Sequence, residues 1–134
     1  MKLAINLMIF GLAQLMAEAL VLSESAGVDR AMLLEVMGDS AAGAPFVKYK
    51  TEPLLQDDYS ATFTTSLMEK DLDLILDLAA HADLALPLAR AIKPLTRATI
   101  DGGHADRDFM ALYLQLRKAS GLDVTTGPVS QVGV

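Results

Sequence analysis

Two polar residues near the start of the chain have a spacing that could do chemistry. Lys2 and Asn6 are four residues apart in an otherwise apolar segment, so in a helix they share one face, one turn apart. A lysine in this position can transfer a proton to a substrate oxygen. A neighbouring asparagine amide can orient the ammonium group or hold that oxygen. On spacing alone, a solvated lysine beside an asparagine facing a partner helix is the commoner arrangement.

A second polar set lies further along the chain. Lys70 and Asp71 begin the segment KDLDLIL, seven residues after Phe63. Taken alone, this pattern is typical of a helix with an aromatic residue at its start and a charged outer face.

Together the two segments resemble the β-hydroxyacid dehydrogenases. KLAIN at residues 2–6 is similar to the K-x-x-x-N motif of that family, and KDLDLIL at 70–76 to its K-D-L-x-L-A-L helix. GGHADRD at 102–108 resembles the family's glycine and aspartate before the last helix. The family includes 3-hydroxyisobutyrate dehydrogenase and the tartronate and glyoxylate/succinic semialdehyde reductases, and is related to 6-phosphogluconate dehydrogenase. The resemblance covers residues 1 to about 121.

The resemblance implies roles for five residues. Lys2 matches the catalytic lysine, which acts as the general acid when a carbonyl is reduced, and Asn6 matches the residue that positions that lysine and the substrate. Lys70 matches the lysine at the cofactor end of the cleft. Phe63 and Asp71 match positions that shape the substrate and nicotinamide site.

The resemblance also implies a cofactor and a missing partner domain. The cofactor is NAD or NADP, bound mainly by an N-terminal Rossmann domain, and the substrate is a small β-hydroxyacid or its semialdehyde. The G-x-G-x-x-G fingerprint of that domain is not found in these 134 residues. We therefore expect the Rossmann domain to be absent and this fragment to be inactive alone.

The elements that must position these residues are helices. Strong helix formers dominate the composition, and the sequence predicts an all-α bundle of five to seven helices around a long apolar N-terminal helix. The resemblance implies that residues 1–121 form the C-terminal helical substrate and dimerisation domain, and we expect residues 122–134 to be an extended or disordered tail.

The predicted boundaries follow capping and breaking signals. The first helix spans residues 2–25 and stops at Gly27, and Asp29 begins the second, at 29–37. Residues 38–62 read as an irregular connection with a helical turn near 44–50. Later helices are predicted at 64–81, 87–100 and 106–119. Pro94 is expected to kink or interrupt the helix at 87–100, and Asp106 to cap the helix at 106–119. In the helix at 64–81 the apolar stripe consists of Leu67, Leu74, Ile75 and Leu78.

Composition narrows the remaining function classes. The chain has no cysteine and a formal charge of −6, which excludes disulfides and thiolate metal sites and argues against nucleic-acid binding. His81 and His104 lack metal-ligand spacing, so no metal is predicted. We expect a cytoplasmic protein.

Two other readings stay open. A long apolar helix needs a partner, which favours a homodimer or higher homo-oligomer and also fits a non-catalytic helical oligomerisation module. Residues 3–22 are about long enough to span a bilayer, but the polar residues Asn6, Gln14 and Glu18 favour a buried helix of a bundle over a membrane span.

Overall fold

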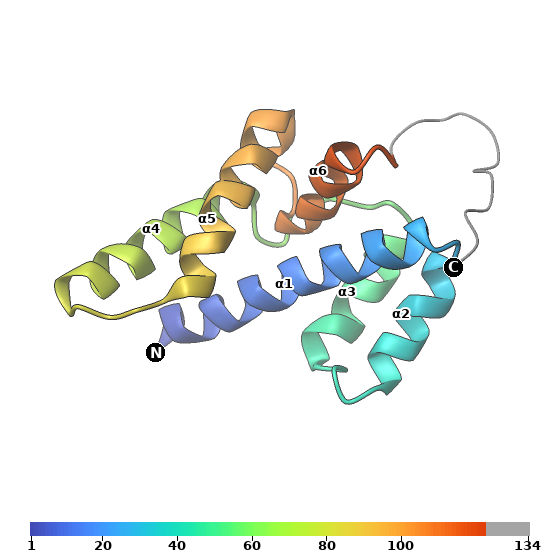
Figure 1. Ribbon diagram of the computed structural model, residues 1–134, viewed down its shortest axis with the longest axis horizontal. Helices are drawn as coiled ribbons and strands as arrows, with labels where there is room; N and C mark the ends of the chain where they lie inside the picture. The colour runs from blue at the N-terminus through green and yellow to red at the C-terminus, as the bar shows by residue number, and fades with distance from the viewer. Residues whose placement is uncertain (123–134) are drawn as a thin grey trace.

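The computed structural model describes residues 1–122, and this part of the chain folds as a helical bundle without a strand (Figure 1). The expected all-α class is confirmed. The elements are α1 (Lys2–Ser25), α2 (Arg30–Asp39), α3 (Pro45–Leu55), α4 (Thr65–His81), α5 (Pro87–Thr99), the π-helical turn η1 (Ile100–His104), the 3₁₀ turn η2 (Phe109–Ala111) and α6 (Leu112–Ala119). The tail expected at 122–134 lies, from residue 123 on, outside the described residues.

Helix α1 is the centre of the bundle, as the sequence predicts. It packs against all five other α-helices of the described part and crosses the whole molecule in Figure 1. By length and composition α1 could also cross a membrane. Its buried residues face the other helices: Phe10, Gly11, Ala13, Gln14, Met16, Ala17 and Leu20.

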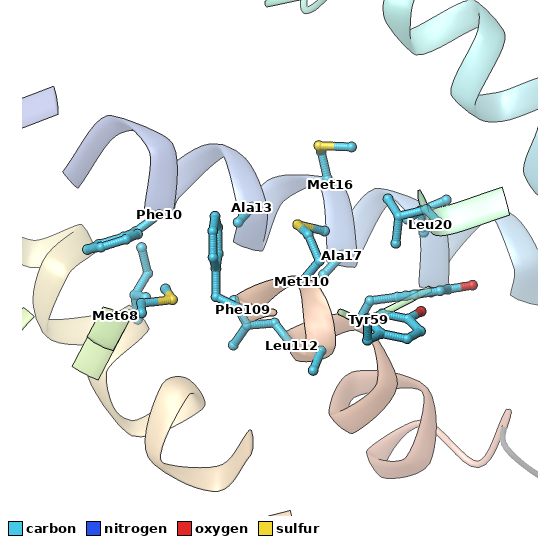
Figure 2. Packing of buried hydrophobic residues seen from close by; sticks show 14 of the residues in the cluster. Phe10, Ala13, Met16, Ala17, Leu20, Tyr59, Met68, Phe109, Met110 and Leu112 are labelled. Carbon is cyan, nitrogen blue, oxygen red and sulfur yellow. The ribbon is translucent and has the colours of Figure 1, made fainter. Parts of the chain in front are cut away.

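Aromatic rings join α1 to the segments before α4 and α6. Phe109 points from η2 toward α1, beside Phe10, with 6.0 Å between the ring centroids (Figure 2). Phe63 lies 6.0 Å from both of these rings. Edge-to-face and tilted pairs at this distance add attraction to the burial of apolar area, so they fix η2 and the start of α4 against α1.

Local signals set several helix ends as expected. The Asp29 side chain accepts a hydrogen bond from the Met32 amide and begins α2, and Thr64 does the same for α4. Gly27 follows α1 with a φ of +79°, a left-handed conformation that costs glycine least.

Two prolines lie inside helices that they do not interrupt, although the kink expected at Pro94 stays a prediction. In the segment 38–62, the helical turn expected near 44–50 is part of the eleven-residue helix α3, which continues through Pro53. Helix α5 likewise continues through Pro94. Each proline removes one hydrogen bond to the carbonyl four residues earlier, here on Tyr49 and Arg90. Both of those residues are exposed, so water can take over the lost bond.

Two expectations about side chains were wrong. Asp108, not Asp106, caps the last helical segment, accepting a hydrogen bond from the Met110 amide. In α4, Ile75 is buried as expected, but the other residues of the expected stripe, Leu67, Leu74 and Leu78, are exposed. The residues that α4 does bury are Thr65, Met68, Asp71, Leu72, Ile75 and Ala79. Because α4 carries apolar side chains on more than one face, its periodicity does not identify the inner one.

Candidate functional site

A hydrogen bond joins two of the five residues singled out by the sequence. The amide nitrogen Nδ2 of Asn6 donates to Oδ2 of Asp71 at 2.7 Å, linking α1 to α4. Asp71 is only 6% exposed. An ionised carboxylate can only accept hydrogen bonds, so Asp71 fixes the orientation of the Asn6 amide. The Asn6 carbonyl oxygen is thereby turned away from Asp71 and available to another donor.

The two lysines of the predicted site lie near Asn6 and Asp71 along the same two helices. Lys2 lies on α1 one turn before Asn6, and Lys70 directly precedes Asp71 on α4. Both lysine side chains are exposed. Among residues 1–122, no ion pair or hydrogen bond ties either lysine to Asn6, Asp71 or Phe63. The structure thus brings the two segments together and leaves their cationic groups open to solvent.

Phe63 borders an apolar cavity that begins beside Asn6. The cavity has a volume of about 430 Å³. It is lined by Asn6, Ile9, Phe10, Pro45, Phe46, Tyr49, Lys50, Thr62, Phe63 and Phe109. These include all four phenylalanines of the chain. An apolar concavity with a few convergent polar groups is the usual form of a small-molecule site.

A buried charged pair that the sequence analysis did not predict lies beside this cavity. Lys50 of α3 is 3% exposed and bonds to both carboxylate oxygens of Asp108, at 2.9 and 2.8 Å. It also donates to Oγ1 of Thr62 at 3.0 Å. Its ammonium nitrogen lies 5.0 Å from the ring centroids of both Tyr49 and Phe109, within range of a cation–π contact.

One signal in the sequence pointed toward this cavity. Most of the scarce aromatic residues fall in the long connection at 38–62 or just after it, and long connections often carry function. Phe10 and Phe109 belong to other segments, however, and the pairing of Lys50 with Asp108 spans 58 residues. Only the folded chain brings them together.

No metal site accompanies these residues. Within residues 1–122, no group of three or more histidine, aspartate or glutamate side chains could hold a metal ion. His81 is exposed at the end of α4, where its Nδ1 lies 2.7 Å from the Asp77 carbonyl oxygen.

The match to known sequences extends over nearly all of the residues that the structure describes. Residues 1–116 match the family described as NAD-binding of NADP-dependent 3-hydroxyisobutyrate dehydrogenase. The chain is 30% identical over 119 residues to the chloroplastic glyoxylate/succinic semialdehyde reductase 2 of Arabidopsis thaliana. That alignment covers 89% of this chain and 33% of the relative. The chain therefore spans about a third of the length of this curated relative.

Solved structures have the same arrangement of helices. A 3-hydroxyisobutyrate dehydrogenase of Mycobacterium tuberculosis, described with L-serine, superposes with a TM-score of 0.76 at 29% identity, over 87% of this chain and 42% of that one. The fold also matches a 3-hydroxyisobutyrate dehydrogenase of Salmonella typhimurium, with a TM-score of 0.80 at 22% identity, over 84% of this chain and 40% of that one.

Proposed function

Because this chain belongs to the family of NADP-dependent 3-hydroxyisobutyrate dehydrogenases, we propose that it is the catalytic-lysine and dimerisation domain of an NAD(P)-dependent oxidoreductase. The reaction interconverts a small β-hydroxyacid and its semialdehyde or ketone. The observation that carries the proposal is the Asn6–Asp71 hydrogen bond, which joins the two motifs that resemble the family's site.

Lys2 and Asn6 have separate tasks in this mechanism. Reduction of a carbonyl leaves negative charge on its oxygen, and the Lys2 ammonium stabilises that charge and donates a proton to it. In the oxidation direction, the neutral amine accepts the hydroxyl proton. The Asn6 carbonyl oxygen, turned away from Asp71, can accept a hydrogen bond from the Lys2 ammonium and so position it.

The residues near Asp71 fit an anionic cofactor. Lys70 is an exposed cation next to Asp71, suited to a phosphate or ribose group of NAD or NADP. When bound, the cofactor supplies or accepts the hydride at the substrate carbon. We expect residues 1–134 alone to turn over no substrate, because a single lysine does not replace a pyrophosphate site at a helix N-terminus.

The second role in the proposal is self-association through α1. Apolar side chains at alternating spacings of three and four residues form one stripe along this helix: Ile5, Met8, Leu12, Leu15, Ala19 and Leu22. Four of them are exposed large side chains, namely Ile5, Met8, Leu15 and Leu22. This spacing is that of a helix packing against another helix, so a second copy of the chain is the proposed partner. A non-catalytic oligomerisation module would show the same stripe, and activity distinguishes the two.

The test compares wild type with Lys2→Ala in a polypeptide that joins these residues to a dinucleotide-binding domain. We expect Lys2→Ala to lower kcat by about 100-fold or more, the usual contribution of a general acid. The dissociation constant of NADPH, measured by fluorescence titration, should change little, because the lysine acts on the transition state.

Lys118→Ala is the control, because Lys118 is an exposed lysine on α6, outside the site. It should keep wild-type turnover. Full activity in Lys2→Ala would contradict the catalytic role, and a self-associating wild type without turnover would favour the oligomerisation module.

A further inference from the structure

The cavity beside Asn6 is much larger than the family's small substrates need. Its volume is about 430 Å³, whereas a cavity of about 150 Å³ lined by aliphatic and aromatic residues already holds benzene. The side chain of 3-hydroxyisobutyrate is a single methyl group. A methyl group would leave most of this cavity to water, in contact with phenylalanine rings.

The lysine in the cavity wall is not available to bind a carboxylate. An ammonium group has three N–H donors, and Lys50 makes three hydrogen bonds, two to Asp108 and one to Thr62. Asp108 also neutralises its charge at 2.8 Å, and both side chains are 4% exposed. An incoming carboxylate would have to displace a buried partner, at the cost of leaving Asp108 unpaired.

The polar and apolar parts of the site therefore lie on different sides of Asn6. Toward the N-terminus of α1 is Lys2, exposed and one turn away. Toward the interior are Ile9 and Phe10, which line the cavity together with the other three phenylalanine rings. A substrate whose hydroxyl or carbonyl group lies at Lys2 and Asn6 can place a substituent among the rings, while its carboxylate stays outside.

From this division we infer that the preferred substrates are hydroxyacids, or their carbonyl forms, with a bulky apolar substituent such as a phenyl ring. This inference rests on the proposed function for the position of the reacting oxygen. The cavity selects the substituent through contacts with Phe10, Phe46, Phe63 and Phe109, whose neighbouring rings are about 6 Å apart by their centroids.

The test measures binding to the 134-residue chain by calorimetry, with two acids that differ in one group. The probes are 3-hydroxy-2-methylpropanoate, which is 3-hydroxyisobutyrate, and 2-(hydroxymethyl)-3-phenylpropanoate, which carries a benzyl group in place of the methyl. We expect the benzyl acid to bind at least about tenfold more tightly, since burying a phenyl ring exceeds the free energy of one tenfold step.

A cavity-filling variant localises the binding. Ile9 is half-buried and lines the cavity, so Ile9→Phe should abolish the tenfold preference. Val36→Phe on the exposed side of α2 is the matched control and should preserve it. Circular dichroism shows whether each variant is folded. If Ile9→Phe is unfolded, Tyr49→Trp at the exposed rim replaces it and should also reduce the preference.

Equal affinity for the two acids, or a preference that survives the filling variant, would overturn the inference. Either result would mean that a protein side chain fills the cavity in solution or that the ligand binds elsewhere. The proposed function fails separately. The benzyl acid could bind in the cavity while the polypeptide with a dinucleotide-binding domain oxidises neither acid. That result would support the pocket and contradict the dehydrogenase role.

Discussion

At the scale of single residues, the Asn6–Asp71 hydrogen bond gives the buried carboxylate of Asp71 in α4 a polar partner. A buried charge without a partner is costly, and Asp71 is only 6% exposed. Its hydrogen-bond partner is the side-chain amide of Asn6. Under the proposed function, Asp71 is a positioning residue, which would act on the substrate through Asn6.

Asp71 gives a prediction that separates positioning from folding. In the polypeptide that includes a dinucleotide-binding domain, Asp71→Leu should lower kcat by about tenfold, the equivalent of 1.4 kcal/mol, because the Asn6 amide loses its fixed orientation. Asp71→Asn keeps an acceptor oxygen and should recover part of the loss. Urea unfolding of the 134-residue chain checks stability, and an unchanged kcat in Asp71→Leu would remove the positioning role.

Tyr59 is a second residue whose burial has a measurable effect. Its hydroxyl makes no hydrogen bond among the described residues. Burial raises the pKa of Tyr59 from 10.0 to about 12, with a smaller contribution from the charge of Asp57. The folded protein therefore holds this proton more tightly than the unfolded chain does.

The sign of the pH effect follows from that difference. Above pH 10 the unfolded chain loses the Tyr59 proton before the folded protein does, so stability falls as the pH rises from about 10 to 12. In Tyr59→Phe this part of the decline should vanish. At pH 7 the variant should be as stable as wild type or up to about 1 kcal/mol more stable, because an unpaired buried hydroxyl is removed. Thermal unfolding from pH 7 to 12 measures both effects, and parallel profiles for the two proteins would contradict the assignment.

At the scale of elements, the pair of Lys50 and Asp108 connects α3 to the turn before α6. Asp108 caps η2 through the Met110 amide and also accepts hydrogen bonds from the amide and hydroxyl of Thr62. Lys50 supplies the compensating charge from α3. One carboxylate thus holds three segments and sets the position of Phe109 in the cavity wall.

The prediction at this scale concerns the loss of one partner. Lys50→Met should lower the free energy of unfolding by about 3–5 kcal/mol, because it leaves the Asp108 carboxylate buried and unpaired. The double variant Lys50→Met, Asp108→Asn should lose less than the sum of the two single variants, since the neutral amide no longer needs the cation. Urea denaturation at pH 7 measures all three, and additive losses would show that the two side chains do not interact.

At the scale of the whole molecule, α1 carries apolar side chains on two opposite faces. Its inner face packs against the other helices, and its opposite stripe, with Ile5, Met8, Leu15 and Leu22 exposed, is the proposed contact with a second copy. The stripe runs from Ile5 to Leu22 of this 24-residue helix, or about 26 Å at 1.5 Å per residue. Apolar side chains that are exposed singly are common on protein surfaces, whereas a continuous apolar stripe of this length is typical of an interaction surface.

The dimer prediction uses two residues with equal exposure. Leu15 on α1 and Val36 on α2 are each 60% exposed. Leu15→Glu should convert a dimer into a folded monomer, because it puts a charge into an apolar contact, whereas Val36→Glu should leave the dimer intact. Light scattering gives the mass, and circular dichroism the helix content. A monomeric wild type, or a dimer in Leu15→Glu, would remove α1 as the interface.

Local patterns in the sequence were enough to predict the helices and most of their ends, because capping and breaking signals act over three or four residues. Asp29 and Thr64 cap their own helices, and Gly27 ends α1 with its own backbone conformation. The spacing of Lys2 and Asn6 is equally local. Proline misled the prediction, because α3 continues through Pro53 and α5 through Pro94.

Which helix faces are buried and which distant side chains meet depends instead on how the whole chain packs. Periodicity favoured Leu67, Leu74 and Leu78 as the inner face of α4, but the Asn6–Asp71 bond lies on the inner face instead. The convergence of the phenylalanine rings on one cavity and the burial of Lys50 with Asp108 join residues from different helices. Burial and charge pairing depend on the packing of the whole chain, so no local pattern contains them. The resemblance of local motifs to a family singled out Lys2 and Asn6, but no local motif predicted the cavity beside Asn6.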